Sequence, residues 1–97
     1  MTTAYYSHPA CRAHDMGAGH PECPQRLDAI ADHLRATGLD IALDWREAPP
    51  ATLDALELAH SAHYVLEMQD LLQRLRDQGE RRALDPDTYA GPATWDA

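Results

Sequence analysis

The chain has 97 residues, about the size of one small domain, so two independent domains are excluded. Apolar residues make up 44% and charged residues 25%, which is the usual composition of a folded globular chain. The 16 acidic and 8 basic residues give a net charge of −8, and every basic residue is an arginine. This balance argues against a nucleic-acid or anionic-membrane partner, because both require clustered cations.

The sequence contains no membrane or export signal. No apolar run approaches the roughly 20 residues that cross a bilayer. The N-terminus lacks the basic and apolar regions of a signal peptide. We therefore expect a cytoplasmic protein in which Cys11 and Cys23 are reduced thiols rather than part of a disulfide framework.

The first half of the chain is predicted to form a strand, a loop, a helix and a second strand. A β-prone run predicts a strand over residues 2–6. Residues 8–24 carry three prolines, two glycines, three histidines and both cysteines without any periodicity, which predicts a long loop. Apolar residues at the spacing of one helix face predict a helix over 24–37, and alternating apolar residues predict a strand over 41–45.

The second half is predicted to be mainly helical. Capping residues and apolar spacing predict helices over 52–59 and 61–78. A turn is expected over residues 85–91, and the start of another helix over 92–97. Strands that alternate with helices predict an α/β fold with a parallel sheet. Two or three strands would leave sheet faces uncovered, so we expect the chain to be part of a larger domain.

The loop also contains the spacing C-x2-H-x5-H-x2-C. Cysteine and histidine are the residue types that zinc prefers, and a structural zinc ion could staple a small binding module. The opposing interpretation is a metal-free loop, because the five-residue spacer is tighter than the roughly 12-residue spacer of ordinary zinc fingers. The four candidate ligands are Cys11, His14, His20 and Cys23.

Read as one longer string, residues 8–27 follow the pattern H-x-x-C-x-x-H-x-x-G-x-G-H-P-E-x-P-x-R-L. This string resembles the N-terminal signature of the histone deacetylase superfamily, in particular bacterial class II-like deacetylases, acetylpolyamine amidohydrolases and acetoin-utilisation-type proteins. Three later segments resemble the same family in the same order: Leu58–Tyr64, Asp85–Tyr89 and Pro92–Ala97. The resemblance therefore covers almost the whole chain.

The resemblance implies a three-layer α/β/α arginase/deacetylase fold around a mainly parallel sheet. It implies zinc-dependent hydrolysis of an acetamide, from acetyl-lysine or an acetyl-polyamine, to an amine and acetate. The family's zinc ligands and catalytic residues match segments beyond Ala97, so it implies no catalytic residue, no metal ligand and no bound zinc in this segment. The expectation is an inactive N-terminal fragment of a single deacetylase domain, whose partners are the remainder of that domain and an acetylated amine.

The resemblance also assigns roles to residues that match the motifs. Arg26 matches an arginine near an internal acetate-release channel, although a salt bridge to Glu22 or Asp28 would explain it equally well. Asp87 matches an acidic position at the tunnel rim, where the alternative is a plain turn shared with Asp85. The residues that match one wall of the substrate tunnel are Gly17, Gly19, His20, Pro21 and Glu22.

A third hypothesis is a self-associating assembly element. It would associate through the uncovered sheet and through an apolar stripe on the second long helix, formed by Leu71, Leu72 and Leu75. The identity of the acetylated substrate and the oligomeric state are left open by the sequence.

Overall fold

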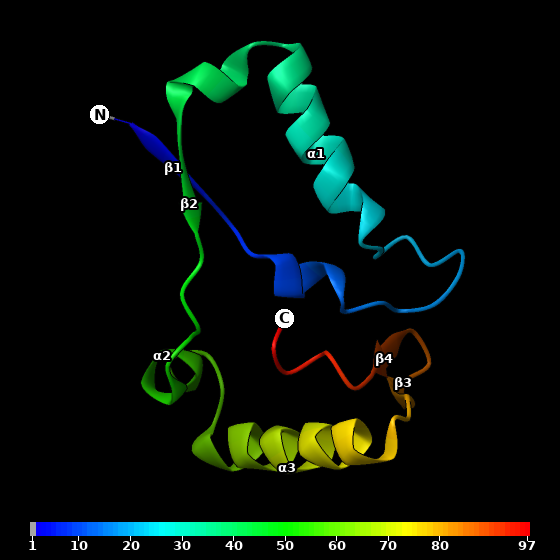
Figure 1. Ribbon diagram of the computed structural model, residues 1–97. Helices are drawn as coiled ribbons and strands as arrows, with labels where there is room; N and C mark the ends of the chain where they lie inside the picture. Colours follow the sequence, from blue (N-terminus) through cyan, green and yellow to red (C-terminus); the bar gives the residue numbers. More distant parts are fainter. Residues whose placement is uncertain (1) are drawn as a thin grey trace.

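The computed structural model describes residues 2–97, and these form two halves joined by residues 48–52 (Figure 1). The first half contains β1 (Thr3–Ser7), the 3-10 turn η1 (Pro9–Arg12), α1 (Gln25–Ala36), the 3-10 turn η2 (Leu39–Ala42) and β2 (Leu43–Glu47). The second half contains α2 (Leu53–Glu57), α3 (Ala62–Gln78), β3 (Arg82–Asp85) and β4 (Thr88–Ala90).

The first half is organised around a parallel pair of strands. Thr3 of β1 lies opposite Leu43 of β2, and the pairing continues to the ends of both strands. The Tyr5 and Trp45 rings pack with their centroids 4.3 Å apart, which adds aromatic contact to the ladder. Arg35 at the end of α1 lies over the Trp45 ring at 5.3 Å, so the helix is tied to the sheet. The structure is therefore mixed α/β with a parallel pair, as the order of elements predicted.

β2 lies two residues later than the predicted strand at 41–45. Gly38 adopts a left-handed conformation with φ of 74°, and the chain then enters η2 before it becomes extended. Arg46 and Glu47 belong to the strand because they pair with Tyr6 and Ser7 of β1. That pairing partner is distant in sequence, and the alternation of apolar residues could not reveal it.

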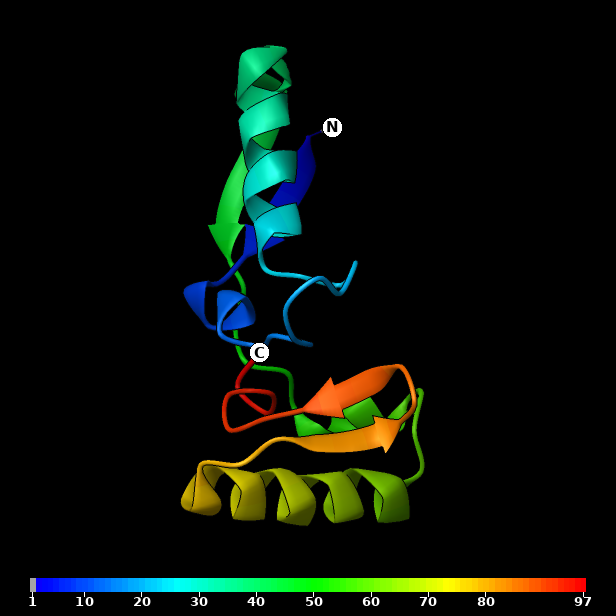
Figure 2. The same ribbon diagram turned by 90° about the vertical axis from the view of Figure 1, so that its right-hand side faces the viewer.

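The second half is held by a small core between α3 and the hairpin of β3 and β4 (Figure 2). The Ser61 hydroxyl accepts a hydrogen bond from the Tyr64 amide at 3.1 Å, which caps the start of α3. Gly79 in the left-handed region ends the helix. Leu72, Leu75 and Ala90 are buried together, so the hairpin covers the apolar face of α3.

The C-terminal part of the chain differs from its predicted form. The expected turn over 85–91 contains the whole of β4, which pairs antiparallel with β3. The expected helix start over 92–97 is a series of turns instead, in which the Thr94 hydroxyl accepts a hydrogen bond from the Gly91 amide at 2.8 Å. This side-chain bond offers the backbone an alternative to helical hydrogen bonds.

The apolar stripe expected to mediate self-association is used within the chain. Leu72 and Leu75 are buried against the hairpin, and Leu71 packs against the same core, so the stripe is not free for a partner.

Apolar side chains elsewhere remain on the surface, and Ile41 and Leu58 are both 89% exposed. The radius of gyration of 15.8 Å exceeds the roughly 13 Å of a compact chain of this length. The two halves therefore leave apolar surface uncovered.

Across residues 2–97, no helix combines the length and apolar character that crossing a membrane would require.

We predict that L72A destabilises the second half because it opens a cavity between α3 and the hairpin. The free energy of unfolding, measured by urea titration, should fall by about 2 to 4 kcal/mol. The matched control is L66A on the same helix, where the side chain is 59% exposed and the expected change is below about 0.5 kcal/mol. Equal losses for both variants would contradict this core.

Candidate functional site

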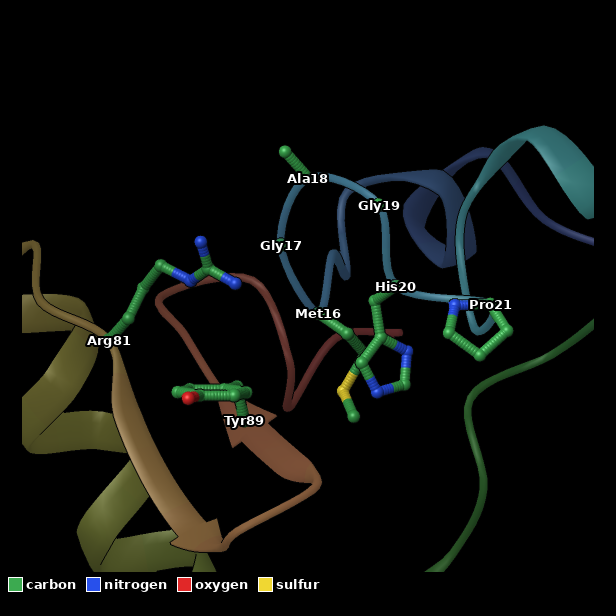
Figure 3. A pocket seen from close by; sticks show the side chains of 8 residues that line it. All are labelled: Met16, Gly17, Ala18, Gly19, His20, Pro21, Arg81 and Tyr89. Carbon is green, nitrogen blue, oxygen red and sulfur yellow. The ribbon is translucent and has the colours of Figure 1, made fainter.

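An open hollow of about 560 Å³ lies where the loop between η1 and α1 meets the hairpin (Figure 3). Residues 16–21 of the loop form one side, and Arg81 and Tyr89 form the other. Figure 2 shows the loop above the hairpin, although the two segments are far apart in sequence. Four of the five predicted tunnel-wall residues, Gly17, Gly19, His20 and Pro21, therefore line the hollow.

The loop has a defined conformation around Gly17. The Asp15 carboxylate accepts a hydrogen bond from the Gly17 amide at 2.9 Å, and the Gly17 carbonyl accepts one from the His20 amide at 3.2 Å. Gly17 has φ of 112°, a conformation that residues with a Cβ rarely adopt. Met16 is buried and anchors this turn. The loop is thus shaped by its own hydrogen bonds and by a glycine that these bonds require.

His20 connects the loop to the hairpin. Its Nε2 lies 3.0 Å from the Asp87 carbonyl oxygen and 3.1 Å from Asp87 Oδ1. Its Nδ1 accepts a hydrogen bond from the Glu22 amide at 3.0 Å. Because Nδ1 is an acceptor, the proton of the neutral ring is on Nε2, where it is donated to Asp87. The His20 side chain is 16% exposed, whereas that of Asp87 is 91% exposed. The pair therefore links a mostly buried imidazole ring to a carboxylate that solvent can reach.

The structure gives different roles to the two neighbouring aspartates. Asp85 Oδ1 accepts a hydrogen bond from the Asp87 amide at 2.8 Å, which closes the hairpin turn. This bond, with further hydrogen bonding from Thr88, lowers the pKa of Asp85 below its ordinary value. Asp85 is therefore the turn residue, and Asp87 is the one whose carboxylate faces outward beside the hollow.

Arg81 and Tyr89 are part of the hollow, and sequence reasoning missed both. The Arg81 Nη2 donates a hydrogen bond to the Asp15 carbonyl oxygen at 2.9 Å, and its Cζ lies 5.8 Å from the centre of the Tyr89 ring. In sequence, Arg81 is one of two arginines after a helix end, where cations are common. Tyr89 stands in the predicted turn motif, which was the one signal available for it.

A second cavity of about 320 Å³ lies on the other side of the same loop and is lined by Glu22 and Arg26 among others. Arg26 Nη2 lies 2.6 Å from Glu22 Oε1, so the salt bridge to Glu22 that the sequence allowed is formed. Asp28 pairs with Arg12 instead. Of the predicted tunnel-wall residues, Glu22 therefore faces this second cavity rather than the first.

The four candidate zinc ligands are not brought to one site, because Cys11, His14 and Cys23 line the second cavity whereas His20 lies at the hollow. His20 is bonded to Asp87, and the His14 Nδ1 lies 2.9 Å from the Thr94 hydroxyl. Cys11 donates to the Ala97 carbonyl oxygen at 3.3 Å, and both cysteines are free. Over residues 2–97, no three His, Cys, Asp or Glu side chains are grouped so that they could hold a metal ion. The geometry therefore contradicts the zinc-stapled module of Cys11, His14, His20 and Cys23.

We predict that His20 is in the Nε2–H tautomer in the folded protein, because Nδ1 accepts the Glu22 amide proton. Long-range ¹H–¹⁵N spectra of the imidazole at neutral pH should show a protonated Nε2 and an unprotonated Nδ1. D87A should leave the Nδ1 bond in place but move the Nε2–H signal, since the Oδ1 acceptor is removed. A ring protonated on Nδ1 alone would contradict the geometry.

We predict that Asp85 contributes to stability in a pH-dependent manner. Its folded-state pKa is lowered from 3.8, so its stabilising contribution is present above that pH and is lost as the pH falls through the folded-state pKa. The stability advantage of the wild type over D85N should therefore shrink below about pH 4. D70N on α3, where the carboxylate pairs with Arg74, is the control for removing a negative charge. An advantage over D85N that does not change with pH would contradict this role.

Known proteins similar to this chain include one family and two relatives. The histone deacetylase domain family matches residues 20–97, which include His20, the hairpin and both residues missed by sequence reasoning. The chain is 38% identical over 86 residues to an uncharacterized protein of Synechocystis sp., covering 86% of this chain and 27% of that protein. It is 33% identical over 79 residues to a histone deacetylase-like amidohydrolase of Pseudomonas aeruginosa, covering 81% of this chain and 20% of that protein.

The chain thus spans about a quarter and a fifth of the lengths of these two relatives. The family match extends over more than half of the chain and includes the hairpin and, from the loop, His20 and Pro21. The chain belongs to the histone deacetylase family.

Proposed function

We propose that these residues form the N-terminal part of a zinc-dependent deacetylase that hydrolyses an acetamide to an amine and acetate. The substrate class is an acetyl-lysine or an acetyl-polyamine. The observation that carries the proposal is the family match over residues 20–97, because it covers the hairpin side of the hollow and, on the loop side, His20 and Pro21. The relative named as a deacetylase-like amidohydrolase supports the same reaction class.

The rest of the domain would complete an arginase/deacetylase fold of three α/β/α layers. Here, β1 and β2 would supply two strands of its mainly parallel sheet, and α1 would be part of one helical layer. The exposed apolar side chains, such as Ile41 and Leu58, would be covered by the other segments of that domain. The short coverage of both relatives agrees with this arrangement.

The residues of this chain do not fit the zinc that the family uses. The four candidate ligands are divided between two cavities, and no group of three such side chains within residues 2–97 is arranged for a metal ion. We therefore assign the zinc ligands to other segments of the parent protein and no step of the hydrolysis to this chain. By this proposal the 97 residues alone are inactive.

The chain's own contribution would be to bind and orient the substrate. The loop of Gly17, Gly19, His20 and Pro21 would form one wall of the substrate path, with Glu22 behind it. Asp87, held by His20, would accept a hydrogen bond from the substrate at the rim, since its carboxylate is 91% exposed. Arg26 would bind the acetate product in the second cavity, because a guanidinium matches a carboxylate geometrically and uses only part of its donors on Glu22.

We predict that the full-length protein, loaded with zinc, releases acetate from an acetyl-lysine peptide, and that the 97-residue chain does not.

D87N in the full-length protein should lower kcat/KM roughly tenfold, because a charged hydrogen-bond acceptor is lost at the rim. The control D70N removes a carboxylate from the surface of α3 and should leave kcat/KM unchanged.

Two results would contradict these proposals. Zinc-dependent turnover by the 97-residue chain would overturn the assignment of zinc to other segments. An absence of acetate release by the full-length protein with both acetyl-lysine and acetyl-polyamine substrates would overturn the proposed reaction.

A further inference from the structure

Arg81 differs from most arginines of the chain in having no acidic partner. Among residues 2–97, six of the eight arginines lie within salt-bridge distance of a carboxylate, and Arg81 and Arg82 do not. The six are Arg12, Arg26, Arg35, Arg46, Arg74 and Arg76. Acidic residues outnumber basic ones two to one, so an unpaired arginine that lines a hollow needs an explanation.

Arg81 is an exposed residue whose guanidinium lines the hollow. Figure 3 shows it above the Tyr89 ring and directed toward Gly17, with His20 on the far side of the hollow. One of its five N–H groups is used on the Asp15 carbonyl oxygen, and that bond fixes its position. The Tyr89 ring supports one face at 5.8 Å. The cation is thus held in place without being neutralised.

Gly17 keeps the approach to the cation open. A Cβ at this position would lie 3.4 Å from Arg81 Nη2 and 3.9 Å from Nη1. With glycine, the loop passes the guanidinium without a side chain that would cover it. The remaining donors of a planar fork are then available to a ligand in the hollow.

We propose that Arg81 is a specificity-determining residue that binds a carboxylate of the substrate next to the acetamide. This inference rests on the proposed function and narrows its substrate class. A guanidinium binds a carboxylate through two parallel N–H···O bonds, which no cationic polyamine can accept. The preferred substrate is therefore an acetylated amine that carries an acidic group, such as an acetyl-lysine followed by an acidic residue, rather than an acetyl-polyamine.

Arg82 provides a matched control for the charge alone. It follows Arg81 directly and also has no carboxylate within salt-bridge distance among residues 2–97. Unlike Arg81, it does not line the hollow at the loop. Both arginines line one hollow beside α3, and a second hollow there is lined by Arg82 but not by Arg81. R82Q thus removes the same charge from the same strand end without altering the proposed subsite.

The test measures binding and does not require turnover. Two fluorescently labelled peptides, with acetyl-lysine followed by Asp or by Asn, are titrated into the metal-free full-length protein and followed by anisotropy. We expect the Asp peptide to bind roughly fivefold to tenfold more tightly than the Asn peptide. In R81Q this ratio should fall to about one, in R81K it should be partly retained, and in R82Q it should stay at the wild-type value.

Two results would overturn the inference. One is a ratio near one in the wild type, and the other is an equal loss of preference in R81Q and R82Q, which would indicate only a long-range effect of charge. Circular dichroism of each variant identifies any loss of folding, and R81K then supplies the comparison. Acetate release by the zinc-loaded protein is measured separately, so a carboxylate preference without hydrolysis would sink the proposed reaction and leave this subsite standing.

Discussion

The hollow depends on the docking of one loop against one hairpin, and two contacts hold them together. His20 bonds to Asp87, and Arg81 bonds to the Asp15 carbonyl, across 67 and 66 residues of sequence. Closing loops of this length costs conformational entropy, which the core of Leu72, Leu75 and Ala90 offsets by holding the hairpin on α3. The hollow is therefore only as stable as the hairpin, which forms the side opposite the loop.

Elements specified by local signals could be predicted from the sequence, and those specified by distant partners could not. The bounds of α3 follow from its cap at Ser61 and its glycine at 79, because both act within one helical turn. β2 is displaced from its predicted position because its last residues pair with β1. β4 was expected to be a turn for the same reason, since three residues become a strand only beside β3.

The candidate site shows the same division. The family resemblance singled out Gly17, Gly19, His20 and Pro21, and the structure places all four at one hollow. The spacing C-x2-H-x5-H-x2-C singled out the zinc candidates. The same spacing could not show that His20 lies at the hollow whereas Cys11, His14 and Cys23 line the second cavity, so that the four do not form one zinc site. Nor could the resemblance separate Asp85 from Asp87, because their difference arises from one hydrogen bond in the turn, which the Asp87 amide donates to the Asp85 carboxylate. Arg81 was missed because its proximity to Gly17 exists only after docking.

The charge distribution decides which substrates such a site can favour. A net charge of −8 suggests at first a preference for cations, as would suit a polyamine. At physiological ionic strength, however, charges separated by more than about 8 Å are largely screened, so nearby groups dominate. Arg81 lines the hollow without an acidic partner, whereas six other arginines already pair with carboxylates. If the hollow binds substrate as proposed, its selectivity would therefore be governed by one local cation and by the Asp87 carboxylate beside it, not by the acidity of the chain as a whole.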